Sequence, residues 1–213
     1  MTPSHHYFEE SPQSRSDTRT IDVTLPDVSF SMRTDRGVFS HGRVDTGTAI
    51  LLREAPPPPP TGTLVDLGCG AGPIALTLAL RAPQASVLAV DVNSRARSLC
   101  GDNAARLGLT NVTVVHPDEV PSDAVVDLIW SNPPIRIGKP ALHATLATWL
   151  DRLAPDGAAV LVVQRHLGAD SLDRWLRSRG HATRRLAARA GYRLLECRVP
   201  GSSGDHSDLR HAE

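Results

Sequence analysis

The chain has 213 residues, and its 40% hydrophobic content is enough to bury the core of one domain with a small appendage. Its 23 basic and 23 acidic residues give a formal net charge of zero, which argues against a surface that is basic throughout. No apolar run approaches the roughly 20 residues that a membrane-spanning helix needs, and the N-terminus lacks the apolar core of a signal peptide. We therefore expect a cytoplasmic protein that contacts no membrane, with three reduced cysteines spaced too widely for a metal site.

Residues 1–60 predict an N-terminal extension, which opens on a polar stretch that we expect to be disordered. The segments 20–25 and 28–33 alternate apolar and polar side chains around a Pro-Asp turn, which predicts a small β-hairpin. Residues 45–53 are typical of a short capped helix, and the five prolines at 56–60 form a stiff spacer.

Residues 61–200 predict a domain in which strands and helices alternate. Strands are predicted at 64–67, 86–91, 112–116, 125–131 and 158–163, helices at 73–81, 94–107, 141–153 and 170–179, and a terminal antiparallel hairpin at 182–186 and 192–199. This alternation specifies an α/β fold with a doubly wound, mostly parallel seven-stranded sheet, whose ligand sites lie at the carboxyl ends of the strands. The tail, residues 201–213, is polar and expected to be disordered.

The sequence VDLGCGAGP at 65–73 joins the first strand of this domain to its first helix through Gly68, Gly70 and Gly72. A turn without Cβ atoms lets a ligand lie against the backbone, but dinucleotide dehydrogenases place glycines in the same position. Asp66, in the strand just before the turn, would repel a pyrophosphate and attract a ligand with a cationic end. The stretch therefore favours a nucleotide-like ligand that carries a positive charge.

Two more carboxylates follow the next strands. Asp91 ends the second strand about 20 residues beyond the glycine turn, where a carboxylate reaches the two hydroxyls of a ribose. Asn93 or Ser94 then caps the following helix. Asp118 has the equivalent place after the third strand, where it either accepts a hydrogen bond from an adenine amine or belongs to a surface turn.

The segment SNPPIRIGK at 131–139 follows the fourth strand. Its two prolines hold a rigid extended bend and remove backbone donors at the mouth of the strand. The side-chain oxygen of Asn132 and the main-chain oxygen of Pro133 can then act as a pair of acceptors for a planar exocyclic amine. Holding both N–H groups of an amine positions its nitrogen toward an electrophile, so this segment predicts transfer of a group to an amine.

Positive charge is concentrated late in the chain: residues 165–198 contain nine arginines against three acidic residues, which leaves +6. Such a face can hold phosphates, although solvated arginines explain it equally well. Arg136 and the single lysine, Lys139, lie beside the acceptor pair, where they contact RNA or form an exposed rim. Phe39 lies in a loop, where it stacks on a base, covers a cofactor or plugs the hairpin.

The runs VDLGCGAGPIAL, VDVN and SNPPIRIGK resemble those of the class I S-adenosylmethionine-dependent methyltransferases, and more narrowly of the small-subunit rRNA guanine-N2 methyltransferases. The segments HYF, TDRGVFSHGRVDTGTAILL and the late GYR also match, so the resemblance runs from about His6 to Arg198. It implies transfer of a methyl group from S-adenosyl-L-methionine to the exocyclic amine of guanine in RNA. The partner that it implies is rRNA or a ribosomal subunit particle.

The resemblance also assigns roles to residues. It implies a cofactor site of Asp66, Gly68, Cys69, Gly70, Gly72, Asp91, Asn93, Asp118 and Asn132, a catalytic segment of Asn132, Pro133, Pro134 and Ile135, and substrate contacts from Phe39, Arg136 and Lys139. Relatives that act on adenine or on glutamine amides commonly carry an aromatic residue at the position of Ile135, so isoleucine favours the guanine branch.

Two-domain relatives carry a second, degenerate methyltransferase copy ahead of the catalytic one, which this sequence lacks. A tRNA or a small molecule therefore stays open as the substrate. The alternatives are a class I methyltransferase acting on a small molecule or a protein amide, and a non-catalytic RNA-binding or assembly factor with the same fold. An NAD-dependent oxidoreductase ranks last.

Overall fold

The computed structural model describes residues 17–36, 38 and 42–199. The expected disorder of the N-terminal start and of the tail, and every role considered for Phe39, lie outside these residues. Within them, no helix is long and apolar enough to cross a membrane.

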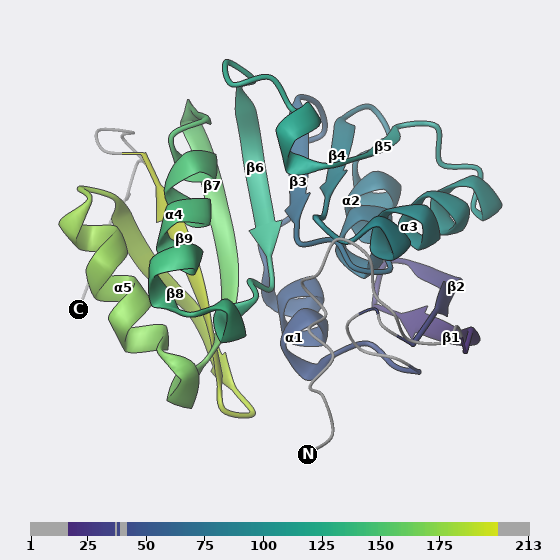
Figure 1. Cartoon of the computed structure of the whole chain (residues 1–213), viewed down its shortest axis with the longest axis horizontal. Coiled ribbons are helices and arrows are strands. Elements are labelled where there is room, and N and C mark those ends of the chain that lie inside the picture. The colour runs from purple at the N-terminus through teal and green to yellow at the C-terminus, as the bar shows by residue number, and fades with distance from the viewer. Residues whose placement is uncertain (1–16, 37, 39–41, 200–213) are drawn as a thin grey trace, which may run out of the picture.

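A seven-stranded sheet forms the centre of the molecule (Figure 1). Its strands are β3 (Thr63–Leu67), β4 (Ser86–Val90), β5 (Val112–Val115), β6 (Val126–Ser131), β7 (Leu153–Gln164), β8 (Ala182–Arg189) and β9 (Tyr192–Arg198). They are ordered β5-β4-β3-β6-β7-β9-β8; β3 to β7 are parallel, and β9 pairs antiparallel with both β7 and β8. The predicted fold class is confirmed, and the strand order reverses between β3 and β6, where such sheets place their ligands.

Helices cover both faces of the sheet. They are α1 (Thr46–Glu54), α2 (Pro73–Arg81), α3 (Ser94–Arg106), α4 (Lys139–Leu150) and α5 (Ala169–Ser178). Successive strand residues point to opposite faces, so Leu64 packs in the core formed with α1, α2 and α3, whereas Val65 packs in the core formed with α4 and α5. Figure 1 shows α4 and α5 in front of the strands β7 to β9.

Strand β7 begins earlier than the sequence predicts, and α4 ends at Leu150 rather than at residue 153. The reason is tertiary, because Leu153 pairs with Val126 and the register then shifts before Leu128 meets Ala158. A Cβ at Gly157 would stand 3.0 Å from the main-chain oxygen of Val126, so this irregularity needs glycine.

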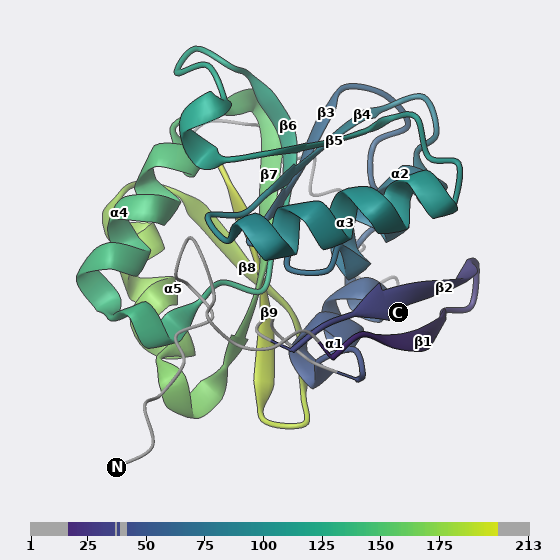
Figure 2. The ribbon, with the colours of Figure 1, turned by 45° about the vertical axis from the view of Figure 1, so that its right-hand side comes forward.

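The predicted hairpin is present as β1 (Arg19–Thr24) and β2 (Ser29–Thr34), which pair antiparallel. It lies against α3 in both ribbon views (Figures 1 and 2). The buried Asn103 of α3 accepts from the Arg33 backbone N–H at 2.8 Å and donates to the carbonyls of Arg33 and Ala71, at 2.8 and 2.9 Å. One side chain thus ties the hairpin to the glycine turn.

Candidate functional site

The glycine turn between β3 and α2 needs glycine for two different reasons. Gly68, Gly70 and Gly72 have φ angles of 81°, 54° and 97°, a region that other residues rarely adopt. A Cβ at Gly72 would stand 2.6 Å from the sulfur of Cys100, so Gly72 permits close packing against α3. A Cβ at Gly68 would meet no atom within 4 Å. The turn is therefore closely packed at Gly72, where α2 begins, and open at Gly68, where β3 ends.

Asp91 follows β4, and its carboxylate accepts a hydrogen bond from the glycine turn. Its Oδ2 accepts from the Gly70 N–H at 2.9 Å, and its Oδ1 accepts from the Asn93 N–H at 2.9 Å. Burial raises the pKa of Asp91, while these two N–H groups and the Arg97 guanidinium oppose that shift. A carboxylate offers about four lone-pair sites, so Asp91 keeps acceptor capacity toward a ligand on the turn.

Asp66 lies fully buried under the turn. Its Oδ2 accepts from the Ala75 N–H at 2.9 Å, in the first turn of α2, and its Oδ1 has no partner among the described residues. Burial raises the pKa of Asp66 to about 8, because desolvation outweighs the bond from Ala75. The carboxyl group is therefore mostly neutral at pH 7, and it holds the start of α2 in place.

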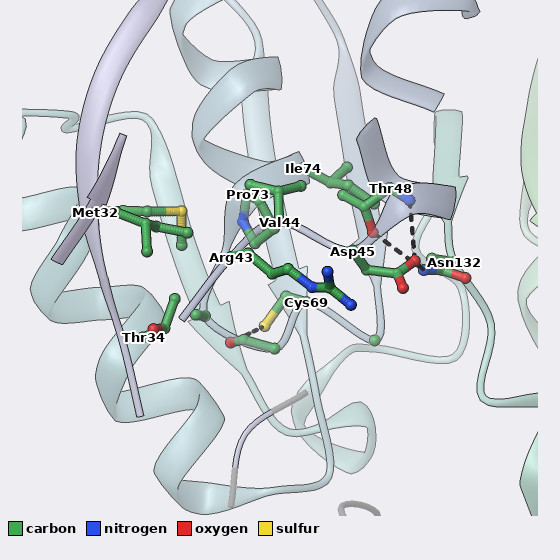
Figure 3. Close-up of a pocket in the computed structure, with 14 residues that line it drawn as sticks. Met32, Thr34, Arg43, Val44, Asp45, Thr48, Cys69, Pro73, Ile74 and Asn132 are labelled. Carbon is green, nitrogen blue, oxygen red and sulfur yellow. Dashed lines mark hydrogen bonds between the residues drawn. The ribbon is translucent and has the colours of Figure 1, made fainter. Parts of the chain in front are cut away.

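A pocket that is partly open to solvent lies over this turn (Figure 3). The β1–β2 hairpin, the loop before α1, the glycine turn and the start of α2 form its walls. Gly68, Cys69, Gly70 and Asn132 are the residues of the sequence prediction that line it. The structure thus brings the turn and Asn132, the first residue of the predicted acceptor segment (residues 132–135), to one pocket at the switch point.

Asn132 stands at the end of β6, beside Ser131, whose hydroxyl donates to the Leu67 carbonyl at 2.7 Å. The Asn132 Nδ2 atom donates to Asp45 Oδ2 at 2.9 Å and to Thr48 Oγ1 at 3.1 Å. The Pro133 carbonyl accepts from the Ile135 N–H at 2.9 Å and retains a second lone pair.

Asn93, Asp118 and Lys139 of the sequence prediction do not line this pocket. Asn93 is buried and caps α3 by accepting from the Ala96 N–H at 3.0 Å. Asp118 lies in the short helix η1 (Pro117–Glu119), with a side chain that is 90% exposed and 3.5 Å from His116 Nδ1. Arg136 belongs to η2 (Ile135–Ile137), and Lys139 is the exposed first residue of α4.

Sequence reasoning missed the wall contributed by the extension. Asp45 and Thr48 were predicted only as part of a short capped helix and of a segment that resembles the family, with no role in the site. Arg43, Val44 and Met32 also line the pocket. The proximity of Asp45 to Asn132 joins residues 87 positions apart, which no local pattern records.

The strand order, the glycine turn with Asp91 after the next strand, and a pocket at the switch point are those of a class I S-adenosylmethionine-dependent methyltransferase. Residues 29–196 match the family described as "Methyltransferase small domain", and the chain belongs to that family. S-adenosylmethionine is accordingly its methyl donor. The site fits this cofactor, because the turn is open at Gly68 and Asp66 keeps an unpartnered buried oxygen.

Among its relatives, the uncharacterized protein YbxB of Bacillus subtilis is 36% identical over 171 residues, which are 79% of this chain and 85% of that protein. The Ribosomal RNA small subunit methyltransferase C of Pseudoalteromonas translucida is 36% identical over 138 residues, 60% of this chain and 37% of that enzyme.

Solved structures of methyltransferases are similar in fold to this chain. The T. thermophilus 16S rRNA N2 methyltransferase RsmC, in complex with AdoMet and guanosine, superposes with a TM-score of 0.72 at 25% identity over 85% of this chain and 50% of that one. The precorrin-6y C5,15-methyltransferase of Geobacter metallireducens shares the fold, with a TM-score of 0.60 at 14% identity over 78% of this chain and 93% of that one. The chain thus spans half or less of the length of these two rRNA methyltransferases.

Proposed function

We propose that the protein methylates the exocyclic amine of guanine in RNA, with small-subunit rRNA as its substrate. The observation that carries the proposal is Asn132, which lines the pocket at the switch point with both amide protons donated away from its oxygen. That oxygen is an acceptor suited to an amine N–H. The similarity to rRNA methyltransferases over 60% and 85% of the chain supports RNA as the carrier of the amine.

In this proposal the domain at residues 61–200 binds the cofactor, and the extension at residues 1–60 contributes to the wall of the site. Bound S-adenosylmethionine supplies an electrophilic methyl group on a sulfonium. Gly68 and Gly70 leave room against the backbone, and Asp91 offers acceptors to ribose hydroxyls. The family resemblance implies that Asp118 approaches the adenine amine and that Asp66 lies near the ammonium group. Because Asp66 is buried and mostly neutral at pH 7, it would offer a hydrogen-bonding oxygen there rather than a full negative charge.

The acceptor segment would hold the base. Pro133 contributes a carbonyl with a free lone pair, and the prolines contribute no competing N–H donors. Ile135 is half-buried and packs against the core around α4, so it offers an apolar edge rather than a ring to stack on. This arrangement suits an amine held mainly by its hydrogen bonds, as expected for the guanine branch.

A basic rim borders the same edge of the sheet, and we define it as Lys139, Arg165, His166 and Arg189. Lys139, Arg165 and His166 are exposed, and the Arg189 side chain is 68% exposed beside Glu54. Arg165 and His166 begin η3 (Arg165–Leu167), directly after β7, and Arg189 ends β8, whose end is at the same edge. The Arg165 N–H donates to the Gly191 carbonyl at 2.7 Å, which joins two parts of the rim. Phosphates of an RNA would find their counter-charges there.

Methyl incorporation into rRNA from a strain that lacks the protein tests the proposal. The wild type should methylate this rRNA, and mass spectrometry of its nucleosides should show an N2-methylated guanine. Asn132→Ala should lower incorporation by about 100-fold or more, because one transition-state hydrogen bond is lost, while the Kd for S-adenosylhomocysteine stays within a few-fold. Full incorporation by Asn132→Ala would refute the role of the amide. Methylation of small amines without RNA would refute the substrate.

A further inference from the structure

Asp45 occupies the N-cap of α1 and makes more contacts than a cap requires. Its Oδ2 accepts from the Gly47 N–H at 2.8 Å and from the Thr48 N–H at 3.3 Å, which satisfies the free N–H groups of the first turn. The same oxygen also accepts from the Asn132 Nδ2 at 2.9 Å (Figure 3). One carboxylate therefore links the start of α1 to the acceptor segment.

The contacts of Asn132 fix which way its amide faces. The NH2 group has two protons, of which one is donated to Asp45 and the other to Thr48 Oγ1 at 3.1 Å. Because a carboxylate only accepts, the nitrogen and not the oxygen must face Asp45. Among the described residues, no hydrogen bond reaches the Asn132 Oδ1, which is thereby turned away from α1.

The platform that carries Asp45 is firmly held. Leu51 and Leu52 of α1 are 0% and 1% exposed in the core shared with the sheet. The Tyr192 ring of β9 lies so close to Gly47 that a Cβ there would stand 2.8 Å from it. Glycine in the first turn of α1 thus lets the helix approach the sheet, which brings Asp45 within reach of Asn132.

We propose that Asp45 and Thr48 are positioning residues that hold the Asn132 amide with its oxygen toward the target amine. The proposal rests on the proposed function, which supplies the amine. Without these two acceptors the amide rotates freely, and in the opposite orientation its NH2 group faces the N–H groups of the amine. Preorganisation of a hydrogen-bond acceptor acts on the rate of transfer rather than on binding of the cofactor.

Three substitutions separate positioning from capping. Serine, asparagine and aspartate cap helices about equally well, so Asp45→Ser keeps the cap but is too short to reach Asn132. Asp45→Asn keeps an oxygen that can accept from the same three N–H groups. We expect Asp45→Ser to lower kcat by about 10- to 100-fold at unchanged S-adenosylhomocysteine affinity. Asp45→Asn should restore most of the rate, and Thr48→Val should lose less than Asp45→Ser.

The orientation itself is read by NMR of the Asn132 side-chain amide in the protein bound to S-adenosylhomocysteine, which needs no RNA. In Asp45→Ser the two amide protons of Asn132 should shift and exchange faster with water, whereas in Asp45→Asn they should stay close to wild type. Asp22→Ser, at an exposed carboxylate on β1, is the matched control and should change neither signals nor rate.

Unchanged Asn132 signals in Asp45→Ser would overturn the proposal, as would a loss in Asp45→Ser that appears in S-adenosylhomocysteine affinity instead of kcat. A wild type that transfers no methyl group to RNA would refute the proposed function instead. In that case the NMR comparison still decides whether Asp45 orients the amide.

Discussion

Asp66→Asn tests whether burial keeps this carboxyl group neutral under the glycine turn. Desolvation raises the pKa of Asp66 to about 8, against an ordinary value of 3.8, and the Ala75 N–H opposes the shift only in part. With a pKa of about 8, roughly nine tenths of the group is protonated at pH 7. Asparagine matches the neutral acid in shape and can still accept from Ala75, so the substitution removes the titration with little change in packing.

The direction in which the free energy of unfolding changes with pH follows from proton binding to Asp66. Between its ordinary pKa of 3.8 and about 8, folded Asp66 holds a proton that the unfolded chain has released. The free energy of unfolding therefore falls as pH rises through this window, by about 1.4 kcal/mol per pH unit, and levels off above pH 8. Between pH 5 and 7 the wild type should lose on the order of 3 kcal/mol relative to Asp66→Asn.

Urea unfolding of both proteins at pH 5, 6, 7 and 8.5, without ligand, measures this difference. Asp27→Asn is the matched control, because its ion pair with Arg81 lowers the pKa of Asp27 and moves its titration below this range. Parallel pH curves for the wild type and Asp66→Asn would refute a neutral Asp66. So would a wild type that gains on the variant as pH rises.

Two further comparisons use matched pairs. Gly72→Ala should lower the free energy of unfolding in urea by about 2 kcal/mol or more, because it adds a left-handed alanine and a clash with Cys100. Gly68→Ala, with open space around it, should lower the free energy of unfolding less but weaken S-adenosylhomocysteine binding more. Equal effects of the two substitutions would contradict the two roles of the turn. Arg165→Glu should weaken RNA binding and flatten its salt dependence. Arg106→Glu, at an exposed arginine that ends α3 at the opposite edge of the sheet, should do neither. Equal losses of affinity would show that the basic rim has no particular role in RNA binding.

The fold was predictable because its signals are local. The buried parallel strands are apolar runs, α1 and α3 begin at capping side chains, and α2 and α4 carry a proline at their start. The alternation of these elements leaves few possible sheets. The error at the start of β7 has the opposite origin. Leu153 joins the sheet only because Val126 lies opposite, and a Pro-Asp-Gly sequence looks locally like the end of a helix.

The site was predictable where a motif carries its own chemistry and unpredictable where chemistry depends on burial or distance. Gly68, Gly70 and Asn132 line one pocket, as the topology requires. The sequence predicts a negatively charged Asp66, whereas burial keeps this group mostly neutral at pH 7, because the sequence does not show that its carboxyl group is fully buried. A helix cap fully explains an aspartate at position 45, so nothing in the local sequence indicates the second contact of this carboxylate, with Asn132.

Both halves of the site take their position from the N-terminal extension. Asn103 joins Arg33 of the hairpin to Ala71 of the glycine turn, and Asp45 joins α1 to Asn132. The turn proposed to bind the cofactor and the amide proposed to hold the amine thus both make hydrogen bonds to, or share a partner with, residues of the extension, in addition to their place in the sheet. Because a methyl group is transferred only when donor and acceptor are aligned, a loosened extension should reduce turnover before it reduces cofactor binding.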